Sequence, residues 1–174
     1  MIYSKDFTNK GVVMRKLLLC GALALMAVSA NAEAWHYELS KSDFSVDYKV
    51  ATLKDKAKGY ELSVSMQQYA DDVNNSATVS IDLPKGIVAA FNCRQGCEAK
   101  INVDGDKNAY PPINILAFSN FKSYGITGES KNFLDILRKA KVVKILLPIS
   151  GGNFDVATFT LDKPFDDNEF KNIK

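Results

Sequence analysis

The chain has 174 residues, with 22 Lys and Arg, 20 Asp and Glu and a single His, so its formal net charge is +2. The length fits one domain, and 47% hydrophobic residues fit a globular protein rather than a disordered one. The balanced charge disfavours a general nucleic-acid binder, and one histidine with three cysteines leaves few ligands for a metal centre. We therefore expect no nucleic-acid partner, no metal and no cofactor.

The first apolar segment predicts a signal peptide. Residues 14–16 give a basic start, residues 17–28 are apolar, and Ala30 and Ala32 fit the small-residue cleavage rule. The apolar stretch is shorter than the roughly 20 residues of a membrane-spanning helix. The sequence predicts cleavage after Ala32, with cleavage after Ala34 as the alternative, and no stable membrane insertion afterwards.

The organisation of the chain follows from this leader. Met14 directly precedes the basic residues, so we expect translation to start there. Cys20 lies within the apolar stretch rather than at its end, which disfavours lipidation. Residues 33–174 would then form a single β-rich domain in the periplasm or outside the cell. The stretch from about residue 162 is polar and predicts a tail without a clear element.

Apolar and polar residues alternate with period two along most of the domain, which predicts short strands. The predicted strands are residues 44–50, 60–66, 77–83, 87–93, 97–103, 113–118, 143–149 and 154–161. One helix is predicted from about Lys131 to Ala140, with Ser130 as its N-cap, and Gly125 and Gly128 indicate a loop before it. About eight strands and one short α-helix predict a mainly β fold, either an antiparallel β-sandwich or a flattened barrel.

The same alternation predicts which face of each strand is buried. In the first strand it places Val46, Tyr48 and Val50 on the apolar face, with Asp47 and Lys49 on the other.

The cysteines of the predicted mature domain are Cys93 and Cys97. Two cysteines in an exported protein predict a disulfide. Three residues lie between them, which fits a three-residue hairpin loop with Gly96 in the left-handed position. Such a bridge would fix the pairing of two antiparallel strands. A redox pair is disfavoured because the spacing is not Cys-x-x-Cys, and zinc is disfavoured because two further ligands are missing.

Two groups of residues are candidates for partner binding. Arg94 and Gln95 lie at the tip of the predicted disulfide loop, which would present them at a low entropic cost, although any hairpin must display some residues at its tip. Arg138, Lys139 and Lys141 form a basic cluster at the end of the predicted helix. The helix dipole explains such a cluster, and contact with an acidic partner is the alternative.

Catalytic constellations are not found, so we expect no enzymatic activity. His36 lies close to the predicted mature N-terminus, which disfavours a histidine-based triad. Ser119 and Lys122 match Ser-x-x-Lys without its companion motifs. Asp104 and Asp106 resemble the start of a calcium loop, but the required glycine and glutamate are missing, which favours an acidic turn.

A wider pattern links these features. The signal peptide is followed by strands, then by Phe91-Asn92-Cys93 and Cys97, which lead into Ile101-Asn102-Val103-Asp104, and later by a helix over 133–141 and a strand over 154–161. This pattern resembles small periplasmic β-sandwich proteins such as the invasion-associated locus B family and the type VI secretion accessory proteins. The resemblance implies accessory or binding roles in the cell envelope and carries over no catalytic residue.

The combined expectation is an exported, non-enzymatic binding or accessory protein of the periplasm. It would bind another envelope or secreted protein through its loops or through an edge strand. The alternatives are an inhibitor or immunity protein that blocks a lysozyme-like or toxin enzyme and, third, a carrier of a small ligand. No feature of the sequence indicates whether the protein is a monomer or an oligomer.

Overall fold

The computed structural model describes residues 33–43, 45–128 and 130–174, which belong to one compact unit, Glu33–Lys174. The predicted signal peptide, Met14 and Cys20 lie outside the described residues. Within these ranges, no helix has both the length and the apolar character needed to cross a membrane.

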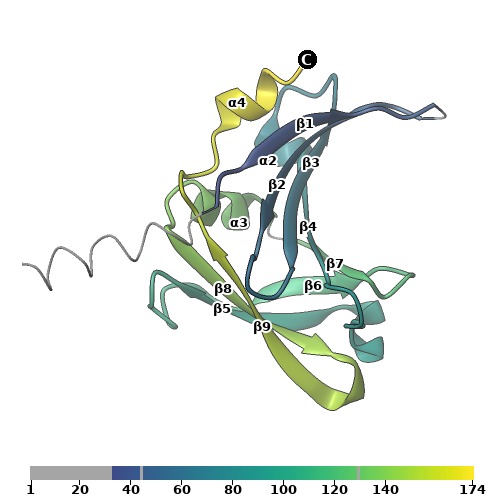
Figure 1. Cartoon of the computed structure of the whole chain (residues 1–174), viewed down its shortest axis with the longest axis vertical. Coiled ribbons are helices and arrows are strands. Elements are labelled where there is room, and N and C mark those ends of the chain that lie inside the picture. Colours follow the sequence, from purple (N-terminus) through teal and green to yellow (C-terminus); the bar gives the residue numbers. More distant parts are fainter. Residues whose placement is uncertain (1–32, 44, 129) are drawn as a thin grey trace, which may run out of the picture. The chain divides into compact units, whose positions relative to one another are not determined.

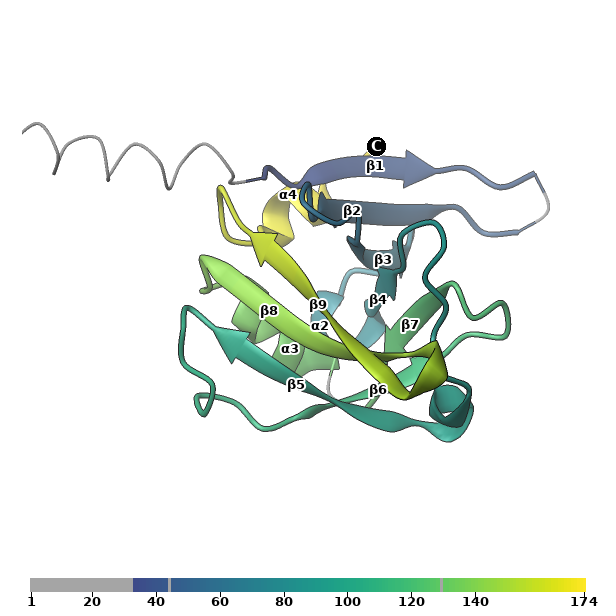
Figure 2. The same ribbon diagram turned by 60° about the horizontal axis from the view of Figure 1, so that its bottom comes forward.

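The described residues form one antiparallel sheet with the strand order β1-β2-β3-β4-β7-β6-β5-β8-β9. The strands are β1 (His36–Ser40), β2 (Tyr48–Lys54), β3 (Glu61–Gln67), β4 (Thr78–Asp82), β5 (Cys97–Val103), β6 (Ile113–Ala117), β7 (Ser123–Ile126), β8 (Val142–Ile149) and β9 (Asn153–Thr160). The sheet curls into a half-barrel, so that β1–β4 face β5, β8 and β9 across the core (Figures 1 and 2). The predicted mainly β class is confirmed.

Three short helices and two 3₁₀ turns complete the described part. They are α2 (Val73–Ser76), η2 (Phe91–Gln95), α3 (Ser130–Leu137), η3 (Ser150–Gly152) and α4 (Asp167–Lys171). Helix α2 packs against α3, and α4 packs against β2 (Figure 1). Phe133, Leu134 and Leu137 of α3 are buried, so this helix adds its apolar face to the core.

The two edge strands meet at one end of the sheet. The backbone N–H of Glu33 donates to the carbonyl of Thr160 at 2.8 Å, and the N–H of Asp162 donates to the carbonyl of Glu33 at 2.9 Å. Glu33 and Leu161 thereby form a parallel bridge between the segment before β1 and the segment after β9. The curled sheet is closed at this point by backbone hydrogen bonds.

Along β9 itself, side-chain contacts rather than backbone pairing join the strand to the turn between β2 and β3. Asp55 is buried in the turn between β2 and β3, and its carboxylate accepts the N–H of Thr158 at 3.0 Å. Asp155 of β9 accepts the hydroxyl of Tyr60 at 2.9 Å and pairs with Lys58. An edge strand normally presents unpaired N–H groups, and the β2–β3 turn covers part of this edge.

The predicted strand over residues 87–93 is wrong. Its only ladder contact is an isolated bridge between Ala89 and Ile149, after which the chain forms η2. The N–H of Ala90 donates to the hydroxyl of buried Tyr124 at 2.8 Å instead of to a neighbouring strand. A tertiary contact thus overrides the local alternation.

Strands β1 and β7 were not among the predicted strands. β7 includes Gly125, which suggested a loop. A Cβ at this glycine would lie 2.9 Å from the ring of Phe118, so the residue allows close packing within the sheet. β1 is a five-residue edge strand with only half-buried side chains on its inner side, which leaves a weak apolar signal.

The face predicted for the first strand is also wrong. β2 begins at Tyr48 and buries Lys49, Ala51 and Leu53, whereas Val46 and Tyr48 are exposed. A one-residue change of phase moves every side chain of a strand to the other face. Lys49 is tolerated on the inner face because its Nζ donates to the carbonyl of Lys171, the last residue of α4.

Helix α3 and the C-terminal segment both differ from the prediction. α3 ends at Leu137 rather than near Ala140, and the hydroxyl of Ser130 donates to the carbonyl of Ile126. The segment after residue 162 is not a tail without structure, because it forms α4 with Asp166 as its N-cap. Its two phenylalanines, Phe165 and Phe170, are buried against each other with ring centroids 5.4 Å apart.

Candidate functional site

Cys93 and Cys97 are bonded, with their Sγ atoms 2.13 Å apart. The bridge does not join two antiparallel strands as predicted, because Cys93 belongs to η2 and Cys97 is the first residue of β5. Gly96, between them, has a φ of 98° and a ψ of 145°, a conformation that favours glycine but is not the left-handed helical one. We call residues 91–97 the stapled turn.

The stapled turn displays an aromatic side chain. Phe91 is 67% exposed, and its ring centroid lies 4.6 Å from that of Phe121. The guanidinium carbon of Arg94 lies 5.7 Å from the centroid of the Phe121 ring, within the range of a cation–π contact. Phe118 begins the turn that carries Phe121 and is also exposed. Two aromatic side chains, Phe91 and Phe121, and Arg94 therefore form one surface patch.

Contacts behind the stapled turn hold it in place. Cys93 is fully buried, and the N–H of Ala89 donates to the carbonyl of Phe121 at 2.9 Å. Tyr124 accepts the N–H of Ala90 and donates its own hydroxyl to the carbonyl of Pro148 on β8. Burial raises the pKa of the Tyr124 hydroxyl, so it stays protonated as a donor.

The residues predicted at the loop tip are exposed there. Arg94 and Gln95 both lie at the surface of the stapled turn. The phenylalanines beside them were not predicted as site residues. The signal that could have found them is Phe91 itself, an aromatic residue directly before the predicted disulfide loop.

The basic cluster has a different environment. The guanidinium of Arg138 donates to Asp135, Asp167 and Asn74, and its side chain is only 18% exposed. Arg138 therefore links α3 to α4 and α2. The side chains of Lys139 and Lys141 are exposed.

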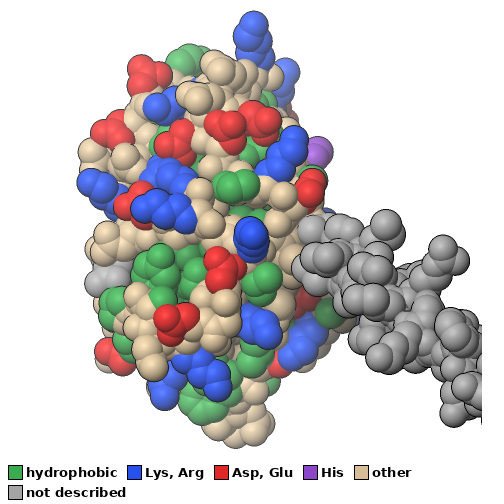
Figure 3. All heavy atoms as spheres, turned by 90° about the vertical axis from the view of Figure 1, so that its left-hand side faces the viewer, with side chains coloured by type: hydrophobic (Ala, Val, Ile, Leu, Met, Phe, Trp, Pro, Cys, Tyr) green, Lys and Arg blue, Asp and Glu red, His purple; other side chains and the backbone are tan. Residues whose placement is uncertain are grey.

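The structure does not bring the basic cluster to the stapled turn. Lys141 donates its N–H to Asp104, which follows the last residue of β5, whereas the stapled turn ends where β5 begins. Seven strand residues separate the two positions, about 20 Å at the usual rise per residue. Figure 3 shows Lys and Arg side chains interspersed with Asp and Glu over the face it displays, rather than gathered in one basic field.

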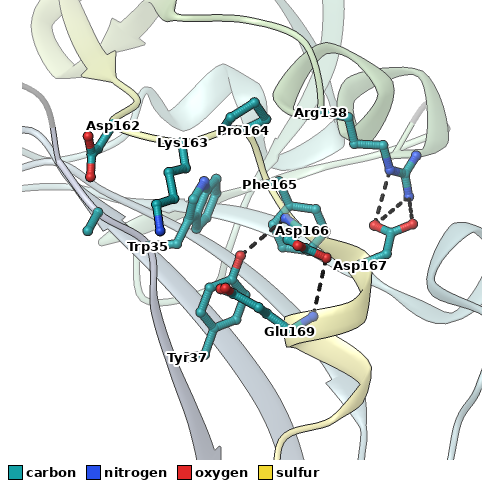
Figure 4. A pocket seen from close by; sticks show the side chains of 11 residues that line it. Trp35, Tyr37, Arg138, Asp162, Lys163, Pro164, Phe165, Asp166, Asp167 and Glu169 are labelled. Atoms are coloured by element: carbon teal, nitrogen blue, oxygen red, sulfur yellow. Dashed lines mark hydrogen bonds and ion pairs between the residues drawn. The ribbon is translucent and has the colours of Figure 1, made fainter.

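A recess of about 560 Å³ lies between the start of β1 and the segment around α4 (Figure 4). We call it the terminal pocket. Its lining residues are Ala34, Trp35, Tyr37, Arg138, Asp162, Lys163, Pro164, Phe165, Asp166, Asp167 and Glu169. The rings of Trp35 and Phe165 make an edge-to-face contact, with their centroids 5.2 Å apart. This pocket was not predicted, because the segment after residue 162 was expected to be a tail without a clear element.

Polar groups of the terminal pocket are only partly paired. The hydroxyl of Tyr37 accepts the N–H of Asp166 at 3.2 Å. Burial raises the pKa of this hydroxyl, and the negative charges of Glu169, Asp166 and Asp167 raise it further. Arg138 holds Asp167 through both carboxylate oxygens (Figure 4). Three carboxylates therefore lie near Tyr37, and Arg138 pairs with one of them.

The candidate catalytic and metal residues are not assembled into a site. Among the residues that the structure describes, no group of His, Cys, Asp and Glu is arranged to hold a metal ion. Asp104 accepts the N–H groups of Lys141 and Val142, so its carboxylate orders a turn. His36 is exposed, and its Nε2 lies 3.4 Å from Oε2 of Glu38 on the same strand.

No family model matches the chain, and no curated protein sequence matches it. Among solved structures, the chain is similar to the crystal structure of invasion associated protein B from Bartonella henselae. The match covers 81% of this chain and 89% of that one, with 17% sequence identity and a TM-score of 0.40. The name of this neighbour is that of one of the two families that the sequence pattern resembles.

Proposed function

We propose that the protein is exported and acts without catalysis, by binding another envelope or secreted protein through the stapled turn. The observation that carries this proposal is Phe91, a largely exposed aromatic side chain on a turn that a disulfide and a buried tyrosine hold in place. The disulfide fits the oxidising environment that an exported protein meets.

The energetics of binding favour such a surface. A phenylalanine buries about 150–250 Å² when it is covered, and aromatic residues, phenylalanine among them, and arginine are enriched at protein–protein interfaces. A turn that is already ordered loses little conformational entropy on binding. Phe91, Phe121 and Arg94 meet both conditions, because the first two rings are in contact and Arg94 lies over the second.

The test compares two exposed phenylalanines. Phe91→Ala and Phe154→Ala remove the same kind of side chain, but Phe154 is 63% exposed at the start of β9 and is not part of the stapled turn. A partner recovered from an envelope extract with the wild-type protein is identified, purified and titrated against each variant. We expect Phe91→Ala to weaken binding by about 30-fold, which corresponds to roughly 2 kcal/mol, and Phe154→Ala to change it less than about twofold.

The proposal would be overturned if both variants bound the partner as the wild type does. Arg94→Ala adds a second probe of the same surface, and we expect it to weaken binding as well. The nature of the recovered partner also matters: inhibition of a lysozyme-like or toxin enzyme upon binding would identify an inhibitor rather than an accessory protein.

A further inference from the structure

We propose that the outer edge of β1 is a dimer interface, at which two copies of this chain pair their β1 strands antiparallel around a twofold axis at Tyr37. β1 ends the sheet, and Figure 2 shows it along the upper rim with β2 as its neighbouring strand. The stapled turn consists of η2, Gly96 and the first residue of β5, so it takes no part in this edge. The inference therefore does not depend on the proposed function.

The outer edge of β1 is not covered by another strand. All of β1 pairs with β2 in unbroken register, from His36 with Thr52 to Ser40 with Tyr48. Among the described residues, no backbone hydrogen bond joins β1 to a segment other than β2. A strand with one neighbour leaves alternate N–H and C=O groups pointing outward, and a strand of another molecule can pair with them.

The two edges of the sheet differ in this respect. On β9 the N–H of Thr158 is taken by the carboxylate of Asp55, which belongs to the β2–β3 turn. β1 has no such cover, and its sequence, His-Tyr-Glu-Leu-Ser, contains neither a proline nor a lysine, two residues that commonly block edge pairing. The edge open to a second molecule is therefore that of β1.

The structure limits where an added strand can lie. At one end, the backbone of Glu33 is already bonded to Thr160 and Asp162. At the other, β1 ends at Ser40, and the following chain turns back on itself through the hydrogen bond between the N–H of Ser42 and Asp47. Residues 34–40 are thus available, and Tyr37 is the middle of this span. Two identical strands overlap along all of it only if Tyr37 lies on the twofold axis.

The exposed side chains of β1 are complementary in this register. His36 lies opposite Glu38 of the second copy, and the same pair recurs on the other side of the axis. Both side chains are exposed in the single chain. A carboxylate opposite an imidazole accepts a hydrogen bond from its ring N–H. A register centred on Glu38 would instead place two carboxylates directly opposite each other, which destabilises a strand pair.

The other face of β1 is complementary as well. Trp35 is buried, and Tyr37 and Leu39, which alternate with His36 and Glu38, are half-buried. Pairing around Tyr37 places the two tyrosines opposite each other and Leu39 of the second copy opposite Trp35. Cross-strand aromatic and aliphatic pairs of this kind stabilise a sheet, and they remove apolar surface from water. One face thus pairs polar side chains and the other pairs apolar ones.

The first measurement is the oligomeric state of the purified protein by analytical ultracentrifugation. One short strand pair buries less area than a standard interface, so we expect a dissociation constant of about 10–100 µM. The protein should then be mostly monomeric at about 1 µM and mostly dimeric at about 500 µM. Hydrogen exchange at both concentrations locates the interface: the β1 amides should exchange more slowly in the concentrated sample, and the Thr158 amide on the opposite edge should not change.

Charge exchange tests the register. Glu38→Lys places a lysine opposite His36, and His36→Glu places two carboxylates opposite each other, so we expect each to weaken dimerisation by about tenfold. The double variant His36→Glu, Glu38→Lys restores opposite charges in both pairs, and its affinity should return to within about threefold of the wild type. Glu98→Lys is the matched control, because it makes the same change at an exposed position of β5, and it should alter dimerisation less than about twofold.

Three results would overturn the proposal. The first is a protein that stays monomeric at the highest concentration. The second is a dimer that forms without slower exchange in β1 and with unchanged affinity in both single variants, which would place the interface elsewhere. The third is a double variant that dimerises no better than the single ones, which would exclude the pairing of His36 with Glu38 of the second copy.

Discussion

Asp55 shows how much one side chain contributes to the closure of this sheet. It is buried, and its carboxylate accepts the N–H groups of Ala57, Lys58 and Thr158 at 2.9, 3.2 and 3.0 Å. The first two bonds order the β2–β3 turn, and the third ties that turn to β9. One carboxylate therefore couples a local turn to a strand about 100 residues away in the chain.

We expect Asp55→Ala to lower the free energy of unfolding by about 2–4 kcal/mol, because three backbone donors lose their acceptor. Urea unfolding followed by circular dichroism measures this change. Asp71→Ala is the control: Asp71 is exposed, and we expect its replacement to change stability by less than about 0.5 kcal/mol. Equal effects of the two variants would contradict the role given to Asp55.

Asp155 predicts a dependence of stability on pH. Its hydrogen bond with Lys58 lowers the pKa of the Asp155 carboxyl, and those from Tyr60 and Val156 lower it further. A lowered folded-state pKa stabilises the protein above the unfolded-state value near 4, and this contribution is lost as the pH falls through the folded-state pKa. Burial and the hydrogen bond to Asp155 raise the pKa of Tyr60 far above its usual value, so Tyr60 stays a donor throughout.

The measurement compares the wild type with Asp155→Asn at several pH values. At pH 7 we expect the variant to be less stable by about 1–2 kcal/mol. Below pH 4 the difference should shrink, because the wild-type carboxyl becomes protonated. A difference that stays constant between pH 7 and pH 3 would show that the charge of Asp155 does not stabilise the fold.

At the scale of elements, α4 is the part of the structure whose importance was least visible in the sequence. Phe170 is fully buried and Phe165 nearly so, and Phe165 also contacts Trp35. The segment from Phe165 through α4 thus covers the start of β1 and forms one wall of the terminal pocket.

We expect Phe170→Ala to lower the free energy of unfolding by about 3–5 kcal/mol, since it leaves a cavity in the core. Phe154→Ala makes the same chemical change at a largely exposed position, and its effect should stay below about 1 kcal/mol. Thermal and urea unfolding of both variants would show the contrast. Similar losses would mean that α4 is not integral to the core.

The disulfide is expected to order the stapled turn more than to stabilise the fold. Its cysteines are only four positions apart, and closing so short a loop stabilises a protein by about 2 kcal/mol in the chain-entropy model. We expect the Cys93→Ala, Cys97→Ala double variant to remain folded and to lose no more than about 2 kcal/mol. Its affinity for the partner should fall, because the turn must then be ordered on binding.

Particular strands show why sequence reasoning succeeded in some places. Residues 60–66, 97–103 and 143–149 alternate clearly, and β3, β5 and β8 bury the predicted side chains. Residues 44–50 alternate as well, yet β2 buries the opposite face, which Ala51 and Leu53 share with Lys49. Lys49 is accommodated there by a carbonyl partner more than 100 residues away. A period-two pattern cannot reveal such a partner. The aromatic patch and the terminal pocket were missed for the same reason, since both join residues distant in the chain.

For the whole molecule, the sequence predicted the β class but not the closure of the sheet. The closing bridge involves Glu33, which follows the predicted cleavage site, and residues just beyond β9. Two backbone hydrogen bonds join the two ends of the described unit there. No periodic pattern encodes which edge strands will meet.

Glu33→Pro tests this closure. Proline has no N–H, so the hydrogen bond to the carbonyl of Thr160 is lost, and we expect the free energy of unfolding to fall by about 1–2 kcal/mol. Glu33→Ala keeps the backbone N–H and should change stability less. If both variants lost the same amount, the side chain of Glu33 rather than its backbone would hold the two ends together.

The way the β2–β3 turn covers β9 also has a kinetic consequence. On its inner side β9 is held by a continuous ladder to β8, whereas on its outer side the N–H of Thr158 depends on one carboxylate. A single side-chain rotation uncovers that amide, while exposing the ladder requires the strands to separate. In deuterated solvent, the Thr158 amide should therefore exchange its proton much sooner than the ladder amides of β8 do, and the outer rim of β9 should be the first part of the half-barrel to open.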